Sequence, residues 1–233
     1  MALRIAFPLS LILLMLTAAL EMALLSSMVY WLHYTAGGQF DTVYNNTVFS
    51  LHGKPVGLLV NQGHTSNGAA GTAFVAVGLG SVLAFWLRGR ARQGRQAGLA
   101  VGFYYTWLTL VVLSALLAIS ALVYTFVLTS HHANQNINLG LASTLNNQPY
   151  PLEVAYPLLT WTPENWFTAV LELPLLSTQD RRSIHSHLLV MKAWRWNLIP
   201  LVVFGVVFAG LAIADAVKWR RERKTYDGKR TFA

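Results

Sequence analysis

Four long apolar stretches constrain this chain more than any other feature of its sequence. They cover residues 5–34, 69–87, 99–129 and 198–217. An α-helix needs about 20 apolar residues to cross the roughly 30 Å of hydrocarbon in a bilayer, and each stretch reaches or approaches that length. Of the 233 residues, 55% are hydrophobic and only 11% are charged, too few to cover a soluble domain of this size. The sequence therefore predicts an integral membrane protein with four spans.

The first stretch has a second interpretation, because Arg4 precedes its apolar core as in a secretory signal peptide. Small residues at Ser26 and Ser27 would suit cleavage. The stretch is, however, longer than the roughly 7 to 15 apolar residues of such peptides. We therefore expect an uncleaved span, with cleavage as the alternative.

Positive charge orients the predicted spans. The short segment 88–98 is rich in arginine, and short cytoplasmic loops are enriched in Lys and Arg. Placing it in the cytoplasm puts both chain ends there, including the basic tail 218–233, and leaves loops 35–68 and 130–197 outside. Basic residues at this membrane face also attract anionic lipid. They are Arg88, Arg90, Arg92, Arg95, Lys218, Arg220, Arg221, Arg223 and Lys224.

The distribution of charge removes the reason to expect nucleic-acid binding. The formal net charge is +8, but the predicted cytoplasmic segments carry twelve Lys and Arg against two acids, whereas the outer loops carry five of each. The basic excess therefore lies at one membrane face, where it sets topology. The expected partners are the lipid bilayer and another membrane protein or a second copy of the chain, in the plasma membrane or secretory pathway.

The first outer loop carries the signals of a β-hairpin. Thr47–His52 and Pro55–Val60 have strand-like composition and flank Gly53 and Lys54, which suit a turn. Asn45 opens an Asn-X-Thr acceptor triplet for N-glycosylation, a modification of the lumenal side. We expect strands at these residues and a glycosylation site at Asn45.

The second outer loop predicts two helices. Thr162 and Pro163 match the cap and first turn of one helix, which should end at Pro174. Ser177 should cap a second, amphipathic helix on the outer membrane surface or on the hairpin, separate from the fourth span. Its apolar stripe consists of Ile184, Leu188 and Met191. The predicted fold is an all-α transmembrane four-helix bundle with a small mixed α/β extracytoplasmic cap from the two loops.

Acidic residues inside the spans are the candidate functional groups. Glu21 lies near the middle of the first span, where a charged side chain costs about 2.5–3.5 kcal/mol on insertion scales, so it should face other helices or water. Thr72 and Ser114 are its expected partners by depth. Glu21 is either a functional intramembrane site or a hydrogen-bonded packing residue. Asp215 lies near the inner surface, where an ion pair with Lys218 would explain it.

The histidines are the other candidate functional residues, since imidazole binds metals and titrates near neutral pH. All seven fall on the predicted outer side, and this suggests metal binding or pH sensing as a hypothesis. No His-Glu-X-X-His spacing occurs, and two histidines spaced by one residue on a helix would diverge. We therefore expect no metal and no other cofactor. The histidines are His33, His52, His64, His131, His132, His185 and His187.

Small residues recur at four-residue spacing in the spans, a pattern of close helix packing. They fit packing inside the bundle or contact with another chain. They are Gly68, Thr72, Ala76, Gly80, Ala84, Gly98, Gly102, Gly205 and Ala209.

The predicted topology resembles the four-span architecture of the claudin and MARVEL groups, including their fungal plasma-membrane relatives. The shared features are the cytoplasmic ends, a hairpin-like first outer loop, a tight inner loop and a larger second outer loop. The claudin signature, Gly-Leu-Trp followed by paired cysteines in the first outer loop, is absent: Gly37-Gly38-Gln39-Phe40 stands nearby, and the chain has no cysteine. The small-residue pattern in the spans, together with the aromatic-rich second outer loop that contains Trp161 and Trp166, predicts a membrane organiser or a subunit of a larger complex, without catalysis. A transporter or channel accessory subunit using Glu21 is the alternative, and a membrane-embedded enzyme is the third interpretation.

Overall fold

A computed structural model describes residues 2–55, 57–91, 97–145 and 160–231, which are mostly helical. Four helical segments are long and apolar enough to cross a bilayer. They are Ile5–Tyr34, Asn61–Arg90, Gly98–His131 and Thr178–Glu222. By the length and composition of these helices the chain is an integral, multi-pass membrane protein with four spans, which confirms the four-span prediction.

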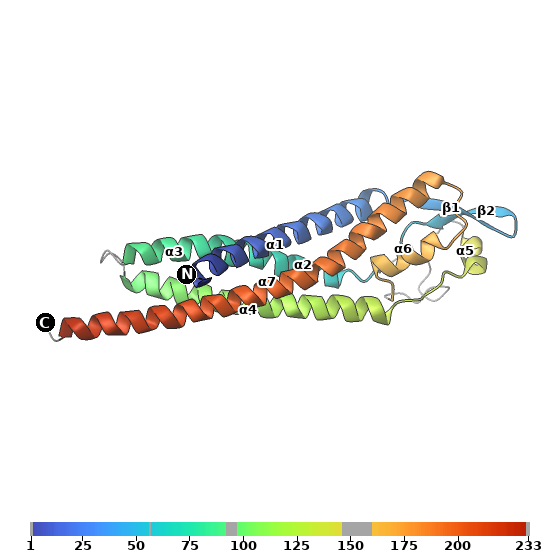
Figure 1. The fold of residues 1–233 in the computed structure, drawn as a ribbon. Coiled ribbons are helices and arrows are strands. Elements are labelled where there is room, and N and C mark those ends of the chain that lie inside the picture. The colour runs from blue at the N-terminus through green and yellow to red at the C-terminus, as the bar shows by residue number, and fades with distance from the viewer. Residues whose placement is uncertain (1, 56, 92–96, 146–159, 232–233) are drawn as a thin grey trace. The chain divides into compact units, whose positions relative to one another are not determined.

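The second span is built from three helical segments in direct succession, the middle one a π-helix. In chain order the elements of Figure 1 are α1 (Ala2–Tyr34), β1 (Gln39–Tyr44), β2 (Thr47–His52), α2 (Asn61–Gly71), η1 (Thr72–Leu79), α3 (Gly80–Ala91), α4 (Ala97–His131), α5 (Leu139–Leu145), α6 (Pro163–Leu171) and α7 (Thr178–Thr231).

The fourth span and the helix predicted before it form one helix, α7. Ser177 does cap the helix, since its Oγ accepts a hydrogen bond from the Asp180 N–H at 3.1 Å. The helix then continues to Thr231 without a separate amphipathic element, so the expected break is absent from the described residues. Neither Gly nor Pro occurs between Thr178 and Asn197, and no local signal stops the helix there.

The chain divides into two compact units, which are described separately. The first unit consists of Met1–Leu20, Gly68–Ser120 and Leu198–Ala233. The second unit consists of Glu21–Asn67 and Ala121–Asn197.

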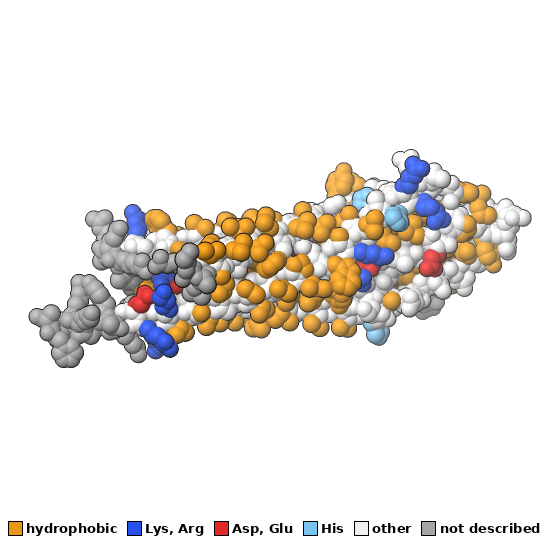
Figure 2. All heavy atoms as spheres, in the orientation of Figure 1, with side chains coloured by type: hydrophobic (Ala, Val, Ile, Leu, Met, Phe, Trp, Pro, Cys, Tyr) orange, Lys and Arg blue, Asp and Glu red, His pale blue; other side chains and the backbone are white. Residues whose placement is uncertain are grey.

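In the first unit, one row of large aliphatic side chains on α1 faces outward. They recur at three- and four-residue spacing along one side of the helix and are 50% to 61% exposed. Figure 2 shows hydrophobic side chains gathered over the long helices on the face drawn. So large an apolar surface belongs against lipid rather than water. The outward side chains of α1 are Ile5, Leu9, Ile12, Leu16 and Leu20.

Aromatic and small residues fill the interior of the first unit. Trp107 is 1% exposed, and its indole N–H donates to the Val77 carbonyl of η1 at 3.3 Å. The Ser81 hydroxyl donates to the same carbonyl at 2.5 Å. A π-helical segment disturbs the regular backbone pattern, and here two side chains donate to the Val77 carbonyl in addition to the backbone N–H of Gly80.

The second unit contains the predicted hairpin with a different partner strand. Thr47–His52 is a strand as expected, but it pairs with β1 in an antiparallel register that sets Phe40 opposite Leu51. Asn45 and Asn46 form the two-residue turn with φ of 48° and 60°, the left-handed values that such turns require. Among the described residues of Pro55–Val60 there is no strand. The turn predicted at Gly53 and Lys54 is therefore wrong, and the hairpin turns at Asn45 and Asn46, a residue type that tolerates positive φ.

The core of the second unit is rich in tryptophan. Alternate hairpin residues point into it, and α5 lies beside the hairpin (Figure 1). Trp166 is fully buried and its indole donates to the Gly53 carbonyl at 2.9 Å, while the Trp31 indole donates to Ser183 Oγ at 3.1 Å. Thr162 caps α6 as predicted, accepting from the Asn165 N–H at 3.2 Å. Indole N–H groups thus join separate segments of a unit that has no disulfide.

Gly53 lies close to the backbone of a neighbouring segment in this core. A Cβ at this position would lie 2.4 Å from the Ala36 carbonyl oxygen and 2.8 Å from that of Gly38. We expect Gly53→Ala to lower the free energy of unfolding by about 1–3 kcal/mol, because two backbone segments must move apart. Thermal unfolding of the full chain in detergent measures the change.

Gly38→Ala is the matched control, since its Cβ would make only an ordinary 3.6 Å contact with the Thr35 carbonyl oxygen. Equal unfolding midpoints for the two variants would contradict the importance of the Gly53 contact.

Candidate functional site

Glu21 is fully buried in the second unit and is linked to α7. Its exposed fraction is 0%, and its Oε2 accepts a hydrogen bond from Asn197 Nδ2 at 2.8 Å. The indole of Trp194 lies next to the same carboxyl group. The indole N–H does not reach hydrogen-bond geometry, so Glu21 Oε1 is buried without a hydrogen-bond partner. The position follows from the α1 sequence, because Leu25 and Met28 continue the same buried face at four- and three-residue spacing.

The residues predicted to accompany Glu21 lie in the first unit. The Thr72 hydroxyl donates to the Gly68 carbonyl of its own helical segment at 2.7 Å, and Ser114 is buried on α4. The hydrogen-bond partner of Glu21 is instead Asn197, which no sequence signal predicts. A single asparagine at the start of an apolar stretch matches no motif, and its pairing with Glu21 spans 176 positions of the chain.

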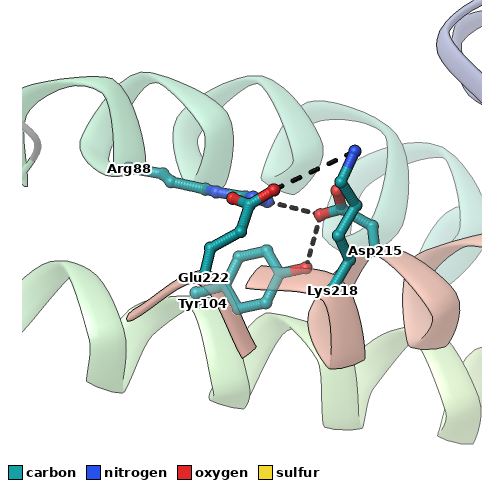
Figure 3. A network of polar contacts seen from close by, with 5 residues as sticks. All are labelled: Arg88, Tyr104, Asp215, Lys218 and Glu222. Atoms are coloured by element: carbon teal, nitrogen blue, oxygen red, sulfur yellow. Dashed lines mark hydrogen bonds and ion pairs between the residues drawn. The ribbon is translucent and has the colours of Figure 1, made fainter. Parts of the chain in front are cut away.

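A second polar cluster lies in the first unit around Asp215. Asp215 Oδ2 forms an ion pair with Arg88 Nη1 and accepts a hydrogen bond from the Tyr104 hydroxyl at 2.8 Å (Figure 3). The expected pair of Asp215 with Lys218 is wrong. Lys218 Nζ instead lies 3.9 Å from Glu222 Oε1, on the exposed side of α7. Asp215 sits nearer the buried face of this helix, so it meets residues of other helices rather than its neighbour in sequence.

Arg88 is therefore an internal residue and not a free surface cation. Its side chain is 10% exposed, and its guanidinium carbon lies 4.8 Å from the ring centre of Trp219 and 5.4 Å from that of Tyr104. Stacking on aromatic faces suits the weakly hydrated guanidinium group. The cluster joins α3, α4 and α7 within the first unit.

The other basic residues predicted at this membrane face are exposed wherever their side chains are described. Arg90 is exposed and its guanidinium carbon lies 4.5 Å from the Trp86 ring centre. Lys218, Arg220 and Arg221 are exposed on α7. Arg92 and Arg95 lie outside the described residues, and the helix at Arg223 and Lys224 is described without its side chains.

The second unit holds one further buried ion pair and a stacked histidine. Glu164 Oε1 lies 3.2 Å from Arg195 Nη2, and burial raises the pKa of Glu164 while the nearby Arg195 and Lys192 partly offset that rise. His187 stacks on Trp31 with ring centres 4.5 Å apart. Across the part of the chain that the structure describes, no three His, Asp or Glu residues lie close enough together to hold a metal ion.

Comparisons of the chain with protein-family models, with curated proteins and with solved structures find no match, so no family is identified. The resemblance to claudin and MARVEL proteins is therefore limited to the four-span architecture. Function has to be inferred from the chemistry of the buried polar clusters.

We expect Arg88→Leu to lower the free energy of unfolding by about 2–3 kcal/mol. The loss stays below the roughly 3–5 kcal/mol of a fully buried broken pair because the Asp215 side chain is 20% exposed. Thermal unfolding in detergent measures it. Adding Asp215→Asn should recover part of the loss, because the carboxylate left without its cation is then removed.

The matched control is Arg90→Leu, two residues away on an exposed face of the same helix. It should change the unfolding midpoint little. An Arg88→Leu variant as stable as this control would show that the buried ion pair does not hold the first unit together.

Proposed function

We propose that this chain is a non-catalytic membrane protein that acts as a subunit of a larger membrane complex or as a membrane organiser. One observation carries the proposal: the acidic groups within the spans are held by contacts inside the protein. Glu21 accepts from Asn197, and Asp215 is held by Arg88 and Tyr104. A pump or an intramembrane enzyme keeps such groups facing a water-filled path or substrate, whereas here they join helices.

The outward face of α4 supports a partner within the bilayer. Gly98, Gly102 and Thr106 recur every four residues and are exposed. A Cβ at Gly98 or Gly102 would meet nothing within 4 Å, so packing inside the chain does not account for these two glycines. By contrast, a Cβ at Gly80 would lie 3.0 Å from Trp107. Small residues allow close approach of a second membrane helix, and this face is where we place the contact.

We expect Gly102→Leu to dissociate the complex, because the added side chain keeps a partner helix from approaching the α4 backbone. In a mild detergent the wild-type chain should elute as an assembly larger than one chain, and the variant should elute as a single chain. Native mass spectrometry identifies whether the partner is a second copy or another protein.

Gly210→Leu provides the matched control, since Gly210 is also exposed with nothing within 4 Å but lies on α7. It should leave the assembly intact. A wild-type chain that is monomeric and without partner in mild detergent would count against the complex-subunit role.

We further propose that both chain ends are cytoplasmic and that the hairpin of the second unit lies outside, in the plasma membrane or secretory pathway. The short arginine-rich connection after α3 supports this orientation, and the basic end of α7 can contact anionic lipid. Asn45 lies exposed in the hairpin turn, where an oligosaccharide would meet no core residue.

We therefore expect chain produced in a eukaryotic membrane to lose mass on treatment with an N-glycosidase, and Asn45→Gln to abolish the shift. A shift that persists in Asn45→Gln, or its absence from the wild-type protein, would contradict glycosylation at this position.

A transporter or channel accessory role is the second candidate. The observation in its favour is Glu21 Oε1, a buried carboxyl oxygen without a hydrogen-bond partner. Such an oxygen could bind and release a proton within a span. The two roles differ in one respect, since proton transfer requires a carboxyl group at this position whereas a helix link tolerates an amide.

A further inference from the structure

A cavity of about 650 Å³ opens in the second unit between the end of α1 and the start of α2. The volume lies within the roughly 300–1,000 Å³ typical of small-molecule sites. Its inner wall is apolar and buried, and is formed chiefly by Leu25, Met28, Leu32 and Trp194. A wall of this kind favours an apolar body in the cavity rather than water.

Two residues of the lining each carry a buried polar atom without a hydrogen-bond partner: Trp194, whose indole Nε1 lies beside Glu21, and Gln62. Gln62 is 2% exposed and lines the cavity, and its side-chain Nε2 donates to the Leu59 carbonyl at 2.8 Å. That hydrogen bond fixes the amide, and Oε1 is left buried without a hydrogen-bond partner. A buried acceptor without a donor costs about 1–3 kcal/mol, so a donor from a bound molecule would be favourable here.

The lining also restricts the charge of that molecule. No Lys, Arg, Asp or Glu belongs to the described lining; the polar rim consists of Ser26, His33, His64, Asn67 and exposed tyrosines. Phosphate head groups are bound by arginine and lysine, which are absent from this lining. The ligand that fits has an uncharged head.

We propose that this cavity binds one uncharged membrane amphiphile, with its apolar body against the Leu25–Met28–Leu32–Trp194 wall and its hydroxyl group donating to Gln62 Oε1. The aromatic end of α1 supports access from the bilayer. Tyr30 and Tyr34 line the same cavity and are 65% and 76% exposed, as expected of side chains at a membrane interface. Sterols and diacylglycerols share this chemistry. Binding of such a molecule does not require the chain to be a complex subunit or a membrane organiser.

The test uses the full chain in phosphatidylcholine nanodiscs with two photoreactive, alkyne-tagged probes, one a sterol and one a diacylglycerol. We expect one of them to label residues 25–34 or 60–67 saturably, with competition by the same unlabelled lipid. The probe that labels these residues shows whether the bound lipid is a sterol or a diacylglycerol. Competition of equal strength by anionic phosphatidylserine would overturn the uncharged head.

Two variants test the cavity itself. Gln62→Leu removes the acceptor with little change in volume and should weaken binding about tenfold. Gly63→Leu places a side chain in the cavity and should abolish labelling; its Cβ would make only an ordinary contact, 3.8 Å from Leu25 Cδ2, and an unchanged unfolding midpoint checks that the fold is kept. Thr65→Leu, which is outside the lining, should bind as the wild type does. Wild-type affinity in Gln62→Leu or in Gly63→Leu, labelling elsewhere in the chain, or no competable labelling would each overturn the proposal.

Discussion

Polar groups inside a bilayer must find their partners within the protein, and this constraint shapes both units of the chain. Water is not available in the hydrocarbon to satisfy a carboxyl group or a carbonyl, and each unsatisfied group costs several kcal/mol. In the first unit Asp215 is held by Arg88 and Tyr104. In the second, Glu21 accepts from Asn197. The acidic residues that cost most in lipid are therefore also residues that fix helices together.

The segments of the second unit are held together without disulfides. Small folds are often cross-linked by disulfides, and this chain has no cysteine. Its hairpin is held by backbone contacts at Gly53 and by the indole of Trp166, while Trp31 reaches the first turns of α7. Tryptophan supplies both a large apolar surface and one directed N–H, so the same residues fill the core and position its segments.

The sequence was sufficient for features that depend on local signals. The lengths of the apolar stretches predicted four spans, and Thr162 and Ser177 predicted helix starts that the structure confirms. Features that depend on long-range pairing were not accessible. The ion-pair partner of Asp215, Arg88 rather than Lys218, depends on which face of α7 packs inward. The strand that pairs with Thr47–His52 depends on the position of the turn at Asn45.

The central claim is that the buried carboxyl group of Glu21 links α1 to α7 and does not transfer protons. It is tested most directly with Glu21→Gln in proteoliposomes, by recording proton flux with a trapped pH-sensitive dye and by measuring thermal unfolding of the same preparations. The account predicts an unfolding midpoint and a proton flux equal to those of the wild type, because the glutamine carbonyl oxygen can still accept from Asn197. Glu21→Leu, which removes that hydrogen bond, should lower the midpoint. A Glu21→Gln variant that unfolds like the wild type but abolishes a proton flux carried by wild-type vesicles would contradict the account.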